Sequence, residues 1–258
     1  MIETGALGKK VFFLYPPPVL SEIVEELARR EFEVYLVHDH ERLRSVLAQD
    51  SDALVFINLD DGLDETGWVS FIDKLRTDDA TKGVRVGVLT LNDRSPDVRK
   101  TYLMDLQVAC GFIVLKIGAG RTMEILVKTL EANEARGRRK FVRAACPPGW
   151  GQCALDHEGN PLRAQIFDLS SAGMAIKFEG DLTLRVGTML RDMTLTIKGS
   201  RIALSGFVAA QRAEPDGSRV HVVMFDPSSV DDTRRERLKT IVFRINQATM
   251  DQHMQTAK

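Results

Sequence analysis

The sequence predicts two folds in succession, a doubly wound α/β domain and then a small antiparallel β-barrel. Over residues 1–135, continuous apolar runs alternate with amphipathic stretches, which is the pattern of parallel strands covered by helices on both faces. From Cys146 onward, apolar and polar residues alternate one by one, which is typical of strands with one buried face. The charge changes as well: residues 1–135 carry 16 Lys and Arg against 23 Asp and Glu, and residues 136–258 carry 19 against 13. The second half is therefore expected to have the affinity for anions.

In the first half, five apolar runs are expected to form a parallel five-stranded sheet. They lie at residues 11–15, 34–37, 53–57, 86–89 and 112–115. Three further stretches place apolar residues at the spacing of a buried helix face, namely residues 20–27, 68–75 and 123–130. Ser95 and Pro96 are suited to begin a helix, and a helix over residues 120–136 is expected to end near Gly137. Strands that alternate with helices predict a doubly wound domain.

In the second half, alternation over residues 174–178, 193–197 and 220–224, with turn signals between the strands, predicts a small barrel. The chain ends in a helical pattern with four apolar residues on one face. These residues are Leu238, Ile241, Val242 and Ile245. We therefore expect the last helix to pack against the barrel or to plug it.

The composition is that of an ordinary soluble globular protein. The chain has 258 residues, of which 44% are hydrophobic and 28% charged, with a formal net charge of −1. Its three cysteines, Cys110, Cys146 and Cys153, predict free thiols in a reducing compartment, although a hairpin disulfide between the last two is geometrically conceivable. There is no secretory leader pattern and no apolar run of the roughly 18 residues that span a bilayer. We expect a cytoplasmic protein without membrane insertion.

Cationic side chains are concentrated where the two patterns meet. Residues 136–143 contain four arginines and a lysine and no acidic residue. A guanidinium binds phosphate in a bidentate way, stacks on aromatic faces and bonds the O6/N7 edge of guanine. Downstream, Asp168 is an acceptor for guanine N–H donors, Ser170 offers a hydroxyl, and Gly173 permits close backbone approach or a positive φ. Together these groups predict a site for a small, flat, doubly anionic ligand.

The order Arg139-x-x-x-Arg143, then Asp168-x-Ser170-x-x-Gly173 after 24 intervening residues, resembles the paired motif of the PilZ domain. That domain is a receptor module for cyclic di-GMP. The resemblance covers about the last 120 residues and implies a six-stranded antiparallel barrel with a C-terminal helix.

The resemblance also implies a role for each motif residue. The two arginines would grip phosphate and stack on guanine or bond its edge. Asp168 would bond guanine N–H groups, Ser170 would bond a phosphate or guanine, and Gly173 would keep the barrel surface open. In this family an arginine in the position of Arg138 accompanies binding of two stacked ligand molecules, so we expect two molecules of cyclic di-GMP per chain.

The expected domains are residues 1–135, a basic connector at residues 136–145, and the barrel with its helix at residues 146–258. Five like charges on the connector repel one another, and ligand phosphates would neutralise them and order the connector against the barrel. We therefore expect cyclic di-GMP to bind at the domain junction, to change the interdomain arrangement and so to regulate a protein partner. Neither a metal nor another cofactor is expected.

The order of elements in residues 1–135 resembles the receiver domain of response regulators. That family takes a phosphoryl group on an Asp that ends the third strand, next to an acidic pair that follows the first strand. It adds a Thr or Ser on the fourth strand and a Lys on the fifth. Here residues 16–18 are prolines and Asn58 ends the third strand, where it can hydrogen-bond Lys116, while Thr90 matches the fourth strand. Because Mg²⁺ requires carboxylate oxygens, we expect that this domain is not phosphorylated.

Two polar clusters in this domain allow other interpretations. Asp60 and Asp61 follow the third strand directly, and either is the alternative phosphoryl acceptor, although a solvated acidic loop is preferred. His38 and His40 could reach one metal ion, but no third ligand is near in the sequence. A polar loop is expected there instead.

Other functions are compatible with parts of the sequence. A basic barrel could bind nucleic acid, but the aromatic residues of this half are not clustered as a stacking platform would require. A PilZ-like barrel could have lost ligand binding and act as a protein adaptor, although the intact motif argues against this. Catalysis is not expected, because no Ser/His/Asp set, metal cluster, phosphate loop or dinucleotide-binding fingerprint is present. A receptor that does not bind nucleic acid is therefore the preferred interpretation.

Overall fold

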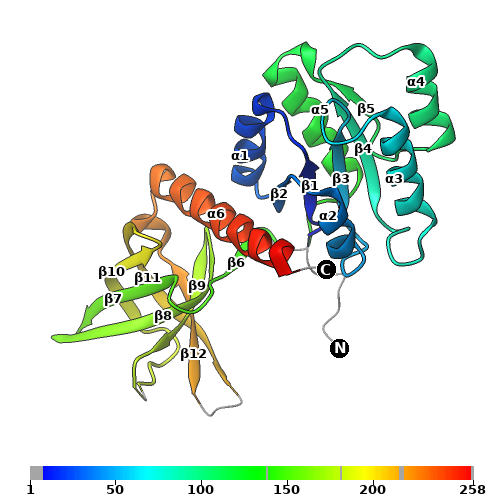
Figure 1. The fold of residues 1–258 in the computed structure, drawn as a ribbon. Helices are drawn as coiled ribbons and strands as arrows, with labels where there is room; N and C mark the ends of the chain where they lie inside the picture. The colour runs from blue at the N-terminus through cyan, green and yellow to red at the C-terminus, as the bar shows by residue number, and fades with distance from the viewer. Residues whose placement is uncertain (1–7, 138, 181, 215–217, 257–258) are drawn as a thin grey trace. The chain divides into compact units, whose positions relative to one another are not determined.

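The computed structural model describes residues 8–137, 139–180, 182–214 and 218–256 (Figure 1). The chain divides into two compact units, one comprising Met1–Lys140 and Gln247–Lys258 and the other comprising Phe141–Asn246. The second unit is thus inserted into the chain of the first. The last helix, which the sequence analysis assigned as a whole to the barrel, is divided between the two units.

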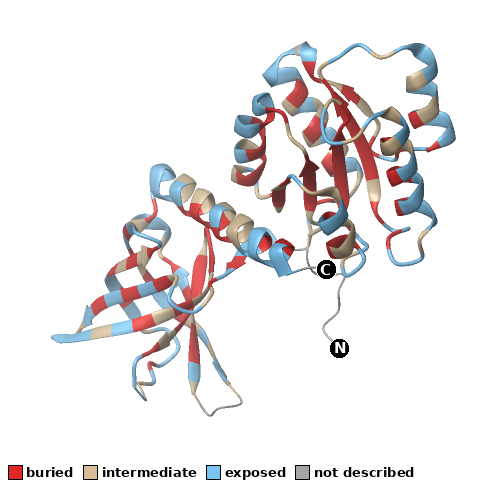
Figure 2. Cartoon of the chain, viewed as in Figure 1, coloured by how far each residue is buried: buried red, intermediate tan, exposed pale blue. Residues whose placement is uncertain are grey.

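The first unit is built on a parallel five-stranded sheet, as predicted (Figure 1). The strand order β2-β1-β3-β4-β5 is one of the two common doubly wound orders and the one found in receiver domains. β1 to β4 are buried over almost their whole length and β5 at Ile113 (Figure 2), because helices cover both faces of the sheet. They are β1 (Val11–Leu14), β2 (Val34–Val37), β3 (Leu54–Asn58), β4 (Arg85–Thr90) and β5 (Phe112–Val114).

Helices follow each strand of this sheet. One face packs against α2 and α3 in a shared apolar core, and α1 contacts α5. The hydroxyl of Ser95 caps α4 by accepting from the Val98 N–H at 3.3 Å, as expected. The helices are α1 (Ser21–Arg29), α2 (His40–Leu47), α3 (Glu65–Thr77), α4 (Pro96–Lys100) and α5 (Ala119–Ala132), with 3₁₀ turns at Pro18–Leu20 and Leu115–Ile117 and a π turn at Thr101–Asp105.

The end of α5 differs from the expectation. The helix ends at Ala132 rather than near Gly137. Glu134 adopts the left-handed conformation with φ 55°, and the N–H of Ala135 bonds the carbonyl of Leu130 at 2.9 Å. This is the capping geometry that glycine usually provides, and a glutamate that adopts it gives no signal in the sequence.

His38 and Asp39 lie in a short loop after β2, as expected, and His40 begins α2. Asp39 is the N-cap of α2, and its carboxylate accepts from the Arg42 N–H at 3.0 Å. The ring of His40 is hydrogen-bonded to the hydroxyl of Tyr15 at 3.0 Å. Among the described residues, no group of three or more His, Cys, Asp or Glu side chains is arranged to hold a metal ion.

The second unit is a closed antiparallel barrel of six strands, as the PilZ resemblance implied (Figure 1). Hydrogen bonding runs β8-β7-β10-β11-β12-β9 and returns from β9 to β8, and the short strand β6 pairs with β8 alone. Buried and exposed residues alternate along β7, which is visible as bands (Figure 2). The strands are β6 (Arg143–Ala145), β7 (Gly151–His157), β8 (Asn160–Ser170), β9 (Gly173–Phe178), β10 (Met189–Ile197), β11 (Ser200–Ala213) and β12 (Arg219–Phe225), followed by a 3₁₀ turn at Pro227–Ser229.

The last helix, α6 (Asp232–Thr256), contributes to both units. As expected, its first half packs into the barrel core, through Leu238, Ile241, Val242 and Ile245. Near its end, Met250 and Met254 join the core of the first unit. Between them the side-chain amide of Gln247 accepts from the N–H of Leu36 at 2.8 Å and donates to the carbonyl of Leu36 at 2.9 Å. Because β2 is an edge strand, this amide satisfies backbone groups that have no neighbouring strand.

The three cysteines are free and buried, so the alternative of a hairpin disulfide is not realised. Burial raises the pKa of Cys110 and of Cys153 to about 12 and the pKa of Cys146 to about 11. The thiols are therefore protonated near neutral pH and are poor nucleophiles. Within the described ranges, no helix combines the length and the apolar character that crossing a membrane requires.

Candidate functional site

The motif turn of the barrel joins β8 to β9, the pair of strands that closes the ring. Ser170 ends β8 and Gly173 begins β9. The buried hydroxyl of Ser170 donates to the carbonyl of Gly173 at 3.0 Å and accepts from the N–H groups of Ala172 and Gly173 at 3.3 and 3.2 Å. The hydroxyl thus fixes the turn through local backbone bonds, which is a common use of serine in turns.

Gly173 is required by close backbone approach and not by a positive φ. A Cβ at this position would lie 2.4 Å from the carbonyl oxygen of Val223 on β12. Gly206 on β11 has the same role from the other side, because its Cβ would lie 2.5 Å from the carbonyl oxygen of Met224. The paired motif singles out Gly173, but nothing in the local sequence distinguishes Gly206.

Strand β6 brings Arg143 onto the same face as the motif. Arg143 is directly opposite Ser170, and Ala145 is directly opposite Asp168. Opposite residues of an antiparallel pair project from the same face of the sheet. Arg143 is exposed and Asp168 is half-buried. Neither charged group has a hydrogen-bond or ion-pair partner among the residues that the structure describes, so a cation and an anion on one barrel face are both accessible to a ligand.

The other connector arginines are in different surroundings. Arg136 belongs to the first unit, where its guanidinium donates to the carbonyl of Arg30 at 3.3 Å and lies 4.6 Å above the ring of Phe32. Arg139 is exposed. Arg138 lies outside the described residues. Of the predicted ligand-binding residues, the structure thus brings together Arg143, Asp168, Ser170 and Gly173.

A polar groove of about 1010 Å³ lies on another part of the barrel surface. Its lining includes one cross-strand row of polar side chains, and none of the predicted ligand-binding residues lines it. The row consists of Thr196, Gln152, Gln165 and Lys177. No motif in the sequence indicates this groove, because its polar row is assembled from four different strands.

Residues 137–244 match the PilZ domain family. The six-stranded barrel with its motif turn is therefore a PilZ domain, and it occupies the C-terminal half of the chain. A comparison with curated protein sequences gave no match.

Solved structures similar to this chain include the PilZ domain of YcgR from Escherichia coli with c-di-GMP. That domain is 16% identical, with a TM-score of 0.39, over 45% of this chain and 96% of that chain. The c-di-GMP complex of MrkH from K. pneumonia is 21% identical, with a TM-score of 0.37, over 44% of this chain and 55% of MrkH. A response regulator from Desulfuromonas acetoxidans is 16% identical, with a TM-score of 0.37, over 48% of this chain and 98% of that chain. The match thus spans little more than half the length of MrkH.

In the first unit, the carboxyl ends of β1 and β3 lack the acidic residues of a receiver site. Tyr15 follows β1 with φ 52°, where the receiver family has acidic residues. Asn58 is buried at the end of β3, where its side chain donates to the carbonyl of Tyr15 at 2.8 Å and accepts from the N–H of Asp60 at 3.2 Å. The expected bond between Asn58 and Lys116 is wrong, because Lys116 pairs with Asp93 at 3.1 Å.

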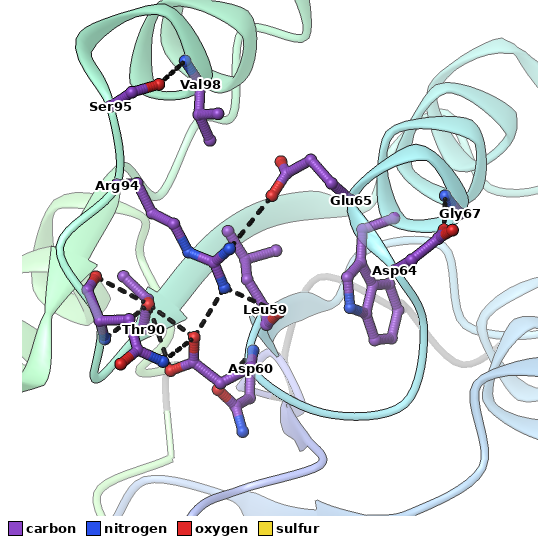
Figure 3. A network of polar contacts seen from close by, with 12 residues as sticks. Leu59, Asp60, Asp64, Glu65, Gly67, Thr90, Arg94, Ser95 and Val98 are labelled. Carbon is purple, nitrogen blue, oxygen red and sulfur yellow. Dashed lines mark hydrogen bonds and ion pairs between the residues drawn. The ribbon is translucent and has the colours of Figure 1, made fainter.

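The carboxylate of Asp60 is surrounded by donors from the end of β4 and the loop that follows it (Figure 3). It accepts from the hydroxyl of Thr90 at 2.9 Å and from the N–H of Leu91 at 2.5 Å. It also accepts from the side-chain amide of Asn92 at 2.9 Å and from the guanidinium of Arg94 at 2.7 Å. Asp60 is therefore an internal anchor for this loop, and the preferred interpretation of a solvated acidic loop is wrong for this residue.

The charge of Asp60 is stabilised by this environment. Burial on its own would raise the pKa of the carboxyl group, but the hydrogen bonds from Leu91, Asn92, Thr90 and Arg94 outweigh burial and hold the pKa below its ordinary value. A carboxylate that accepts several bonds stays ionised. This role could not be predicted from the residues around Asp60, because its four partners follow some thirty residues later in the chain.

Gly173→Ala is expected to destabilise the barrel by about 1–3 kcal/mol, the usual effect of forcing extra volume into a tightly packed place. The added methyl group would meet the Val223 carbonyl, so β9 must move away from β12. Chemical denaturation of both proteins measures the change. Gly120→Ala is the matched control, because a Cβ at Gly120 meets nothing within 4 Å. Equal stability of Gly173→Ala and the wild type would contradict the structural role of Gly173.

Proposed function

We propose that this chain is a receptor for cyclic di-GMP. The observation that carries the proposal is the pairing of β6 with β8, which sets Arg143 opposite Ser170 in a PilZ domain. A phosphate-binding guanidinium is thereby next to the turn that carries Asp168, an acceptor for guanine N–H groups. The c-di-GMP complexes of YcgR and MrkH are in line with this ligand.

The connector arginines complete the proposed site. Arg139 precedes Arg143 by four residues, so its Cα is at most about 14 Å away along an extended chain, and its long side chain can reach a ligand bound at Arg143. Arg138 is the residue that we propose recruits a second molecule stacked on the first. The dinucleotide would thus bind where the two units are joined, with cations from both sides of the junction.

Arg143→Ala and Arg139→Ala are each expected to weaken the binding of cyclic di-GMP by about tenfold to a hundredfold. Charge-assisted hydrogen bonds contribute roughly 1.5–3 kcal/mol each, and about 1.4 kcal/mol corresponds to a factor of ten. Isothermal titration calorimetry measures affinity and stoichiometry together, and the wild type is expected to saturate at two nucleotides per chain. Arg201→Ala, which removes an exposed cation at the start of β11, is the control and should bind normally.

One result would favour a different function. Ser170 and Gly173 both have a structural role in the barrel, so the motif turn can persist without a ligand. If the wild type shows no heat at micromolar nucleotide, the receptor proposal fails and a protein adaptor becomes the better interpretation. If the wild type binds one nucleotide per chain instead of the expected two, only the proposed role of Arg138 is contradicted.

We propose that ligand binding changes the arrangement of the two units and so regulates a protein partner. Like charges on the connector repel one another in the free protein, and phosphates would neutralise them. Small-angle X-ray scattering is expected to give different profiles with and without cyclic di-GMP. Arg143→Ala, at the same nucleotide concentration, should keep the profile of the free protein. Superimposable wild-type profiles would rule out the switch.

We further propose that the first unit is not phosphorylated. Both oxygens of Asp60 already accept hydrogen bonds from the protein, and Asn58 occupies the end of β3. Incubation with acetyl phosphate and Mg²⁺ should therefore give no phosphoryl increment in the intact mass. An increment that is lost in Asp60→Asn or in Asp61→Asn would contradict the proposal and identify the acceptor.

A further inference from the structure

The register of the barrel strands continues the motif into a row of exposed apolar side chains. Gly173 is directly opposite Met224, Met224 is directly opposite Phe207, and Phe207 is directly opposite Met189. The three side chains expose 39%, 37% and 44% of their surface. Directly opposite residues share a face of the sheet, so they form one outer row that starts at the motif glycine. We call Met224, Phe207 and Met189 the apolar row.

Apolar exposure of this kind is not general on the barrel. On β10, β7, β8 and β9, outward-facing side chains line the polar groove. The cross-strand row there consists of two glutamines, a lysine and a threonine. Exposed apolar side chains that are contiguous mark binding surfaces more often than isolated ones do. The apolar row is therefore a local feature that adjoins the motif turn.

The end of the apolar row at Met224 adjoins, through Gly173, the cationic part of the proposed site. Arg143 is opposite Ser170, and the turn from Ser170 leads to Gly173. Neighbouring strands lie about 4.8 Å apart, so Met224 is about 5 Å and Phe207 about 10 Å from the motif glycine across the sheet. Gly173 has no side chain that would cover Met224. A ligand held by its phosphates at Arg143 thus has an open apolar surface within the span of a dinucleotide.

We propose that Met224 and Phe207 receive the flat face of a purine base of the ligand, an inference that rests on the proposed function. A purine has apolar faces and polar edges, and it stacks on an aromatic ring or against a thioether. The cations and Asp168 bind phosphates and base edges, and the apolar row binds a base face. The row therefore selects a ligand that presents a base next to its phosphates, and inorganic phosphate or pyrophosphate lacks this part.

Calorimetry on the full chain tests the apolar row. Met224→Ser and Phe207→Ser are each expected to weaken cyclic di-GMP binding by about tenfold, the scale of one lost base–side-chain stacking contact. The salt dependence of the affinity should stay that of the wild type, because the charged contacts remain, whereas Arg143→Ala should reduce it. Phe207→Tyr keeps the ring and should bind normally. Met104→Ser, at an exposed methionine of the first unit, is the control for loss of an apolar side chain.

A spectroscopic measurement gives an independent readout. In protein labelled with carbon-13 at the methionine methyl groups, the Met224 signal should move upfield on addition of cyclic di-GMP, because a methyl group above a purine face is shielded. The signal of Met104 should not move, and Met224→Leu assigns the resonance.

The outcomes distinguish this inference from the proposed function. If the wild type does not bind cyclic di-GMP, both are wrong. If the wild type binds while Met224→Ser and Phe207→Ser keep its affinity and the Met224 methyl signal does not shift, the receptor function stands and the assignment of the apolar row is overturned. A protein partner that binds the apolar row would give this second result.

Discussion

Closure of the barrel depends on the pairing of β8 with β9, and the turn that joins these strands is the motif turn. A closed ring removes the exposed strand edges of an open sheet. This turn therefore stabilises the barrel whether or not a ligand is bound. Ser170 bonds the backbone of the turn, and Gly173 lets β9 approach β12 closely. The same residues thus hold the barrel together and border the proposed site. The charged groups of Arg143 and Asp168 next to them make no such contacts among the described residues, and these are the groups that the proposed ligand would contact.

Much of the fold follows from local patterns, because strand and helix periodicity depend on near neighbours. The five continuous apolar runs predicted the parallel sheet, and the stretches of alternating apolar and polar residues predicted the barrel. What depends on contacts between distant residues could not be foreseen. The pairing of Gly173 with Met224 joins positions about fifty residues apart, and neither residue signals the other. For the same reason the anchoring role of Asp60 and the close approach at Gly206 were missed. The arginines and the motif turn could be recognised because their spacing is itself a local pattern.

In the first unit, Thr90 matches the Thr or Ser that receiver domains have on the fourth strand, but here it bonds a carboxylate of the protein. Thr90 bonds the carboxylate of Asp60 and Arg94 neutralises it, so a permanent negative charge of the protein holds the loop after β4. A phosphoryl group would hold such a loop only while it is attached. In this chain the contacts that hold the loop come from the protein itself, and the proposed response to cyclic di-GMP is assigned to the other unit. The contrast between an acidic first half and a basic second half agrees with the proposed roles, because the excess of Lys and Arg is in the half that would bind an anion.

The division of α6 has a practical consequence for dissecting the protein. A fragment that stops at Lys140 would lack Met250 and Met254 from its core and the amide of Gln247 from the edge of β2. An uncovered strand edge is a template for pairing with another chain. Self-association of such a fragment would then report a missing helix and not a native dimer. A faithful version of the first unit needs the final helical turns restored, for instance by a short fusion that bypasses the inserted barrel.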